Sequence, residues 1–331
     1  MTLKETLNRV RIMPNGAIVM DNILACDGHS HNAILRVITH AHSDHIIDLS
    51  KSVRFCRYVI STPVTFDLIT VLKGIKIRRK IGLSYDIPFN INDYIIVLKR
   101  ARHIPGAAQV FLESPDGITI GYTGDFKLPG TPPLDVDILV TEATYGMPNY
   151  VRPPPEIIKQ TLFDLVRRSL RVGPVTILGY HGKLQEVMEL LRKEFPEVPF
   201  LASKRVYLVS QVVRRHGMNI YDIWPLNSLE GREIEAYGHY IFFDHIMSRR
   251  QGRGIRIYLS GWLFNKPMKK IASKEYIVAF SDHADFNQLL EYITSCSPKI
   301  VIVDSTRSSC APIFAKEVRK RLNLTAISLP R

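Results

Sequence analysis

Short apolar segments along the chain alternate with stretches in which apolar residues recur every three or four positions. The apolar segments predict strands, for example at residues 34–38, 94–98 and 136–140. The spaced patterns predict amphipathic helices, for example after Pro63 and over residues 183–195. Because the two patterns alternate, the sequence predicts an α/β fold.

The same patterns continue to the end of the chain. Further strands are expected at residues 16–24, 53–60, 109–112, 118–122, 175–178, 255–259, 276–280 and 299–303, and further helices after Pro155, after Ser203, after Asp285 and at the C-terminus. The turn at residues 114–117 (Ser-Pro-Asp-Gly) predicts a hairpin. Ser203 is expected to cap its helix, and Asp285 with Gln288 resembles a capped helix start.

The middle of the chain differs from its two ends. Between Gly146 and the strand predicted at 276–280 there is no cluster of histidine and aspartate residues, and one predicted helix carries Lys204, Arg205, Arg214 and Arg215. The last segments return to apolar strands that end in polar residues. We therefore expect the middle to form a separate α/β layer that contributes shape and charge.

The charge balance favours an anionic partner. The chain has 331 residues and a net charge of +13, and nucleic acid is the commonest reason for such an excess in a soluble enzyme. A merely basic, solvated surface is the alternative.

The four cysteines are widely spaced without a CxxC pair, which fits a reducing, cytoplasmic setting. No apolar run approaches the roughly 18–20 residues of a membrane span, and the N-terminus lacks a signal-peptide core, so we expect a soluble protein.

The segment Thr39-His40-Ala41-His42-Ser43-Asp44-His45 follows a strand of buried type. In an extended segment, His40 and His42 point to the same side, so both imidazoles can reach one cation. Asp44 and His45 follow where the chain turns and are better placed for a second cation about 3.5–4 Å away. The sequence thus predicts a two-metal site, and the alternative is a histidine-rich turn without metal.

Other polar residues also follow predicted strands. His103 precedes a Pro-Gly turn, Asp125 follows the hairpin, and Glu142 follows residues 136–140. A carboxylate at the position of Asp125 is a natural bridge between two divalent cations. Asp27 is either a turn residue or the partner that orients a ligand histidine, and both readings stay open. His29 and His31 form another HxH pair, but no apolar strand precedes them, so we expect loop residues.

The ordered set of motifs resembles the metallo-β-lactamase superfamily and, within it, the β-CASP nucleases, across essentially the full chain. The closest similarity is to the DNA-ligase-associated exonucleases and to archaeal proteins like mRNA 3′-end processing factors. The residues that carry the resemblance are the segment 39–45, His103 before Pro-Gly, Gly124-Asp125-Phe126, Glu142-Ala143-Thr144-Tyr145-Gly146, Ser260-Gly261-Trp262 and Phe280-Ser281-Asp282-His283-Ala284-Asp285.

The resemblance implies a fold and a domain plan. The fold is an αββα sandwich of α/β class with an inserted, smaller α/β β-CASP domain. The metallo-β-lactamase domain then comprises residues 1–143 and a C-terminal return at 264–331, and the inserted domain comprises residues 144–263.

The resemblance also implies two zinc ions, with manganese as an alternative. His40, His42 and His103 hold one ion, Asp44 and His45 hold the second, and Asp125 bridges them, while Asp27 matches the family's first aspartate and orients a ligand histidine. Asp44, Glu142 and His283 have catalytic roles, and His283, held by Glu142, donates a proton to the leaving oxygen.

One position departs from the family pattern. Ribonucleases of this family usually place a histidine, the last ligand of the second zinc, at the end of the final strand, where this chain has Asp304. DNA-directed relatives often have an apolar residue there. Asp304 is therefore either a metal ligand or an aspartate that caps the turn at Ser305 and Thr306, and both stay open.

The expected activity is zinc-dependent hydrolysis of phosphodiester bonds in DNA or RNA by a hydroxide that bridges the metal ions, with exonucleolytic action on single strands. Ser260, Trp262, Ser305, Thr306 and Arg307 are the expected nucleic-acid contacts, and DNA-repair or RNA-processing proteins are the expected partners. Two alternatives remain: a metallo-hydrolase of a small ester or thioester, and an inactive subunit that binds nucleic acid. Neither the polarity of cleavage nor the oligomeric state follows from the sequence.

Overall fold

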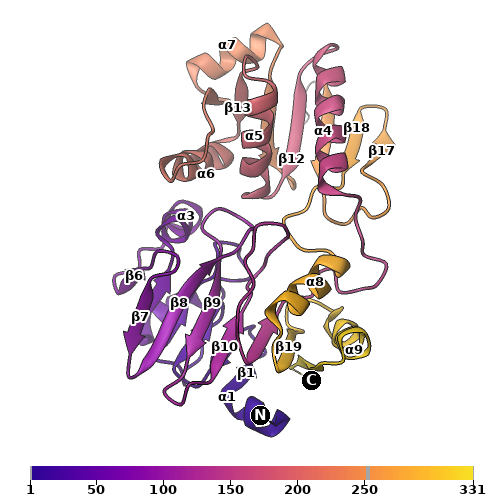
Figure 1. The fold of residues 1–331 in the computed structure, drawn as a ribbon. Coiled ribbons are helices and arrows are strands. Elements are labelled where there is room, and N and C mark those ends of the chain that lie inside the picture. The colour runs from indigo at the N-terminus through magenta and orange to yellow at the C-terminus, as the bar shows by residue number, and fades with distance from the viewer. Residues whose placement is uncertain (1, 251–253, 331) are drawn as a thin grey trace. The chain divides into compact units, whose positions relative to one another are not determined.

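The chain folds into two units, which are described separately. The computed structural model describes residues 2–250 and 254–330. The first unit comprises residues 1–150 and 283–331, and the second comprises residues 151–282 (Figure 1). The second unit thus begins and ends later than the insertion expected at 144–263. Its sheet extends beyond residue 263 because two later strands, at 268–272 and 275–278, pair with it.

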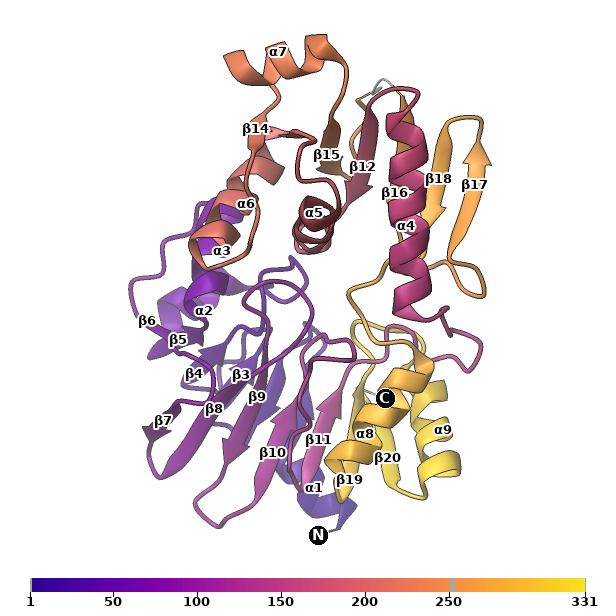
Figure 2. The ribbon, with the colours of Figure 1, turned by 45° about the horizontal axis from the view of Figure 1, so that its top comes forward.

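The first unit contains two sheets that face each other. Neighbouring strands of the first sheet are, in order, β1 (Val10–Ile12), β2 (Ile18–Met20), β3 (Leu24–Cys26), β4 (Leu35–Val37), β5 (Tyr58–Ser61) and β6 (Lys80–Gly82). Neighbouring strands of the second are β20 (Thr325–Leu329), β19 (Ile300–Asp304), β11 (Ile138–Thr141), β10 (Thr119–Tyr122), β9 (Ala108–Glu113), β8 (Tyr94–Arg100) and β7 (Pro88–Ile91), and Figure 2 shows most of this row.

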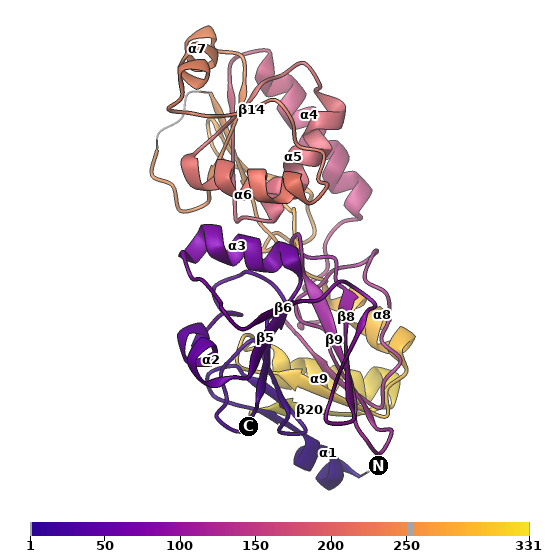
Figure 3. The same cartoon turned by 90° about the vertical axis from the view of Figure 1, so that its left-hand side faces the viewer.

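Apolar side chains from both sheets form one core. Met20 and Leu35 of the first sheet and Ile96, Val110 and Val140 of the second belong to the same buried cluster. The helices of this unit are α1 (Leu3–Arg9), α2 (Leu49–Phe55), α3 (Pro63–Lys73), α8 (Phe286–Cys296) and α9 (Ala311–Leu322). In the side view of Figure 3, α2 and α8 lie at the two outer sides of this unit, with β5 and β8 between them. This is the expected αββα sandwich.

The strand directions bring the predicted site residues to one edge. Strands β3, β4 and β5 are parallel in the first sheet, and β10, β11 and β19 are parallel in the second. Strand β8 has the direction of β10 because both are antiparallel to β9. The loops that follow β3, β4, β8, β10, β11 and β19 therefore meet, since parallel strands present their carboxyl ends at the same edge.

The second unit is built on one mostly parallel sheet. Its strands lie in the order β14 (Ile223–Pro225), β13 (Phe200–Ala202), β15 (Ile241–His245), β12 (Val175–Gly179), β16 (Ile255–Leu259), β18 (Glu275–Val278) and β17 (Met268–Ala272). Its helices are α4 (Pro155–Leu170), α5 (Lys183–Glu194), α6 (Lys204–Arg215) and α7 (Leu229–Tyr237). Only β17 is antiparallel to its neighbour.

Several local predictions are confirmed and two are wrong. The hairpin β9–β10 and the capping box of Asp285 and Gln288 form as expected. The predicted strand at 53–60 begins too early, because residues 53–55 are the last turn of α2, which buries Leu49 against the unit. Ser203 occupies the N-cap position of α6, but its side chain makes no capping hydrogen bond.

Among the described residues, no helix is both long enough and apolar enough to cross a membrane.

Candidate metal centre

Three histidines from the loops that follow strands β4 and β8 lie close together. Nδ1 of His42 lies 3.1 Å from Nε2 of His40 and 3.0 Å from Nε2 of His103. The HxH spacing brings His40 and His42 to one side as expected, and the loop after β8 adds His103. Burial lowers the pKa of His40 well below its usual range. Its ring is therefore neutral near pH 7, which is the form that binds a cation.

Asp125, in the loop after β10, is the common neighbour of the histidines. Its Oδ2 atom lies 3.5 Å from Nε2 of His40, 3.7 Å from Nε2 of His103 and 3.2 Å from Nε2 of His45. The ligand atoms of His40, His42, His103 and Asp125 all lie within 4.8 Å of one another. One carboxylate oxygen thus faces both predicted sets of ligands.

The ring of His45 is oriented by a hydrogen bond to Asp27. Its Nδ1 atom lies 2.7 Å from Oδ2 of Asp27, and the same carboxylate accepts hydrogen bonds from the backbone N–H and the hydroxyl of Thr39. Burial alone lowers the pKa of His45, but the charges of Asp125 and Asp27 raise it well above its usual range. Without a cation the ring therefore carries a proton, which a metal ion between the same carboxylates would replace.

Asp44 is the most open of the predicted ligands. Its side chain is 56% exposed, and its Oδ2 atom lies 3.5 Å from Nε2 of His45. The Nε2 atom of His45 is buried and has no hydrogen-bond partner among the described residues, although two carboxylates lie near it. A buried ring nitrogen aimed between carboxylates in this way fits a divalent cation, and the mixed imidazole and carboxylate donors fit zinc-type metals.

Glu142 and His283 form a second pair at the same edge. Nδ1 of His283 lies 3.0 Å from Oε2 of Glu142, which also accepts a hydrogen bond from the hydroxyl of Thr144. Oε1 of Glu142 accepts a hydrogen bond of 2.9 Å from the backbone N–H of Phe126. The buried carboxylate is thus fixed, and it orients the imidazole. Ligand atoms of Asp125, Glu142 and His283 also lie within 4.8 Å of one another.

The C-terminal residues of the predicted site are arranged differently from the expectation. Oδ1 of Asp304 accepts hydrogen bonds from the backbone N–H and the hydroxyl of Thr306, and Oδ2 lies 2.8 Å from Nη1 of Arg307. The carboxylate therefore caps the turn, which was one of the two open readings. The hydroxyl of Ser305 donates to the carbonyl of Pro330. Thr306 and Arg307 donate these hydrogen bonds to Asp304 within the unit, and their expected role as nucleic-acid contacts stays a prediction.

The two other expected nucleic-acid contacts lie in the second unit. Ser260 and Trp262 follow strand β16, and Trp262 is 61% exposed. One important residue has only a weak signal in the sequence: Arg36, a fully buried arginine inside strand β4, whose Nη2 atom donates to the carbonyl of His45 at 2.9 Å. A charged residue within an apolar strand is the only hint of this contact.

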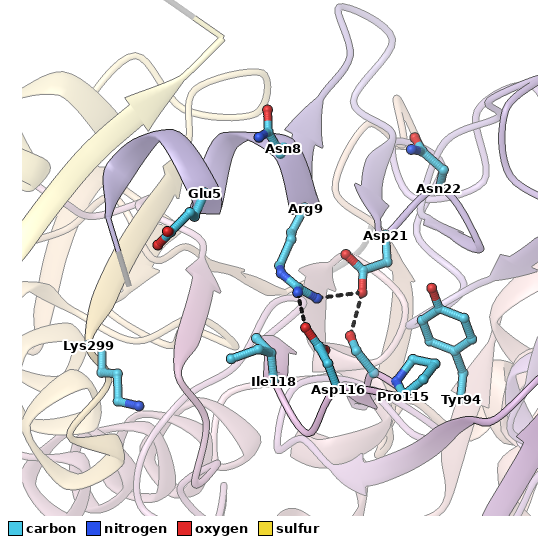
Figure 4. A pocket seen from close by; sticks show the side chains of 11 residues that line it. Glu5, Asn8, Arg9, Asp21, Asn22, Tyr94, Pro115, Asp116, Ile118 and Lys299 are labelled. Carbon is cyan, nitrogen blue, oxygen red and sulfur yellow. Dashed lines mark hydrogen bonds and ion pairs between the residues drawn. The ribbon is translucent and has the colours of Figure 1, made fainter.

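An open polar pocket of about 700 Å³ lies at the opposite ends of the strands of the first unit (Figure 4). Arg9 of α1 forms ion pairs there with Asp21, at 3.1 Å, and with Asp116 of the β9–β10 turn. The hydroxyl of Ser114 donates to Asp21. These charges satisfy one another and hold α1 to the hairpin, so the pocket is explained by structure alone.

Comparisons with known proteins agree with this arrangement. No family model matches the chain. It is 39% identical over 139 residues to the protein named "Uncharacterized protein in lig 3′region" of Acidianus ambivalens, a match that covers 41% of this chain and 99% of that protein. It is 24% identical over 340 residues to the 5′ exonuclease Apollo of Mus musculus, covering 95% of this chain and 59% of Apollo.

A solved structure shares the fold. The crystal structure of a protein of unknown function from Enterococcus faecalis V583 has a TM-score of 0.55 and 14% sequence identity, over 81% of this chain and 74% of that one. The chain spans less than two thirds of the length of the relatives that carry functional names, for example 59% of Apollo. The fold, the order of the motifs and the relatives together show that the chain belongs to the β-CASP family of the metallo-β-lactamase superfamily.

Proposed function

We propose that the protein is a metal-dependent nuclease that hydrolyses phosphodiester bonds of DNA or RNA, acting as an exonuclease on single strands with two zinc ions, or manganese in their place. The relative Apollo is named as a 5′ exonuclease. The observation that carries the proposal is the position of Asp125, whose Oδ2 atom lies within 3.7 Å of ring nitrogens of His40, His45 and His103. Such a carboxylate suits a bridge between two cations.

The ligands divide into two sets around this bridge. His40, His42 and His103 would hold one cation, and Asp44 and His45 the other. When bound, a pair of divalent cations lowers the pKa of water and neutralises the oxygens of the phosphate. Asp27 and Thr39 keep the ring of His45 in place, because Nδ1–H donates a hydrogen bond to Asp27 and Nε2 is left directed at the site.

The pair of Glu142 and His283 suits proton donation to the leaving oxygen. Glu142 accepts from Nδ1 of His283 at 3.0 Å, so the protonated ring presents its second N–H at Nε2. The anchored carboxylate also stabilises the imidazolium. His283 would therefore act as the general acid, and Glu142 would set its orientation and charge.

The inserted unit is suited to a polyanion. Residues 151–282 contain 21 lysine and arginine residues against 13 aspartate and glutamate residues, so they carry +8 of the net charge of +13. Helix α6 contains no acidic residue, and Lys204, Arg205, Arg214 and Arg215 are exposed on it. These groups favour sequence-independent contact with phosphates. We also propose that its protein partners act in DNA repair or RNA processing.

The test is cleavage of DNA and RNA strands, single and double, labelled at either end, by the purified full chain with zinc or manganese. We expect stepwise release of nucleotides, and we expect Asp125→Asn and His42→Asn to abolish it while the protein stays folded. Asp116→Asn, at the opposite ends of the strands, is the matched control and should retain full activity.

Three outcomes would overturn the proposal. Turnover by Asp125→Asn would show that the site is elsewhere. Hydrolysis of a lactone or thioester without any nuclease activity would assign a small-molecule hydrolase. Metal content near zero after gentle purification, together with nucleic-acid binding, would assign a binding subunit.

A further inference from the structure

Arg307 links three separate segments of the first unit. It lies in the turn between β19 and α9, and its side chain is only 13% exposed. Its Nη1 atom donates to Oδ2 of Asp304 at 2.8 Å, and its Nη2 atom donates to the backbone carbonyls of Asp27 and Asp44, each at 3.1 Å. A single guanidinium thus joins the end of β19 to the two loops that carry Asp27 and Asp44.

The surroundings are built to place this guanidinium. A Cβ atom at Gly16 would lie only 2.8 Å from Nη2 of Arg307, so a larger residue there would displace the side chain. Asp304 is 3% exposed, and its other oxygen is held by Thr306. The carboxylate therefore has one fixed orientation, with Oδ2 toward the arginine. A guanidinium suits contacts with three segments because it has several N–H donors in one rigid plane.

A second arginine holds the other side of the same loop. Arg36 donates from Nη2 to the carbonyl of His45 at 2.9 Å and from Nη1 to the carbonyl of Ile47 at 3.2 Å. The carbonyls of Asp44, His45 and Ile47 are thus each held by a guanidinium. The loop forms no helix or strand at these positions, so these contacts supply hydrogen bonds that regular structure would otherwise provide.

We infer that Asp304 and Arg307 are a positioning pair for the second metal position: Asp304 orients Arg307, and Arg307 fixes the backbone from which Asp44 and His45 reach toward Asp125. The inference rests on the proposed function, because it assigns these two side chains to the second cation. Asp304 then serves the metal position through Arg307 and is not itself a ligand. The exposed side chain of Asp44 needs such support, because an exposed carboxylate on an unsupported loop would sample many orientations.

The test is a titration of metal-free protein with zinc, by calorimetry and by competition with a chelator of known affinity. The variants are Asp304→Asn, Arg307→Lys, Arg307→Met and the double variant Asp304→Asn/Arg307→Met. Arg9→Met is the matched control, because Arg9 also joins separate segments of this unit through ion pairs with carboxylates (Figure 4). Thermal unfolding of each variant separates a loss of metal affinity from a loss of fold.

We expect each single variant to bind the first zinc as the wild type does and the second about 10–100-fold more weakly, the usual cost of removing an outer partner of a metal ligand. The double variant should bind the second zinc no more weakly than Arg307→Met does, because both changes remove the same support. Arg307→Lys should recover part of the affinity, since it keeps the charge and one donor. Arg9→Met should bind both ions normally.

Two results would overturn the inference. If Asp304 is a ligand, Asp304→Asn will lose the second ion while Arg307→Met, which releases the carboxylate, keeps it or binds it more tightly. If all the variants bind two ions with wild-type affinity, the pair has no role at the metal position. Should Arg307→Met fail to fold, Asp304→Asn and Arg307→Lys still decide the question. A wild-type protein that binds fewer than two ions would instead refute the proposed two-metal site.

Discussion

Nδ1 of His45 and Oδ2 of Asp27 lie 2.7 Å apart, and both side chains are fully buried. The contact joins the loop after β3 to the loop after β4, and it fixes which nitrogen of His45 faces Asp125. Asp27 therefore combines both roles expected for it. It orients the ring of His45, and it is also a turn residue, with a left-handed backbone conformation and φ of 55°. The contact therefore contributes to the geometry of the proposed second metal position by setting the orientation of His45.

Replacement of Asp27 by asparagine should weaken the second metal position. The amide is a poorer acceptor for the imidazole N–H, so the zinc affinity of that position should fall about 10–100-fold. Competition with a chelator measures the change, and Asp116→Asn serves as the control. Unchanged affinity for two ions would show that Thr39 and the backbone hold His45 without the carboxylate.

Replacement of His283 by asparagine should separate catalysis from metal binding. If His283 is the general acid, kcat should fall by about 10²–10⁴-fold, the usual contribution of such a group. Zinc content, measured by elemental analysis, should remain that of the wild type. Loss of one zinc would instead make His283 a ligand, an arrangement that its closeness to Asp125 and Glu142 also allows.

Removal of the exposed ring of Trp262 should weaken the binding of single strands. Stacking of a base on an aromatic side chain contributes about 1–3 kcal/mol, so Trp262→Ala should raise Kd about 5–150-fold. Tyr237→Ala is the control, because Tyr237 is 83% exposed but lies on α7 rather than after β16. Fluorescence anisotropy with a labelled oligonucleotide measures both. Equal effects of the two changes would count against a specific role for Trp262.

Much of the candidate metal centre can be predicted because its residues follow strands at short, regular spacing. The position of His103 before a Pro-Gly turn and of Asp125 after a hairpin depends on local pattern, and both join His40 as expected. The αββα sandwich follows from the same pattern together with the family resemblance.

The orientation of Asp304 could not be predicted in the same way. It depends on Arg307, whose other contacts are backbone carbonyls of Asp27 and Asp44, far away in the sequence. The second unit ends at residue 282, beyond the 263 expected for the insertion, and β17 gives little signal for this end because it is an edge strand with mostly exposed residues that lacks the apolar pattern of a buried strand. Contacts made by backbone atoms leave no signature in side-chain pattern.

The stability of the first unit should depend on pH through Asp137. Burial raises the pKa of this carboxyl, but Lys299 at 2.6 Å and hydrogen bonds from Thr119 outweigh this and lower it below the usual value. The lowered pKa means that Asp137 stabilises the fold above the unfolded pKa of about 3.9 and loses this contribution as the pH falls through the folded value. Asp137→Asn should therefore cost about 1 kcal/mol near pH 7, and the difference from the wild type should shrink on acidification. Urea unfolding at several pH values measures this, and a constant difference would rule out the carboxylate charge as the cause.

Removal of metal should destabilise the first unit and leave the second unchanged, since all the proposed ligands lie in the first. A ligand that binds only the folded state stabilises it by about 4 kcal/mol when its free concentration is 1,000 times Kd. Without the cation, the buried carboxylates of Asp27 and Asp125 are balanced mainly by the proton on the ring of His45. Hydrogen exchange followed by mass spectrometry should therefore show faster exchange in residues 40–48 after chelation, whereas α5, within the inserted unit, should exchange at the same rate. In His42→Asn the chelator should have a smaller effect, because one ligand is already missing. Identical exchange of the wild type with and without chelator would mean that the metal contributes nothing to the stability of this loop, and that the hydrogen bonds from Arg36 and Arg307 are sufficient to hold it.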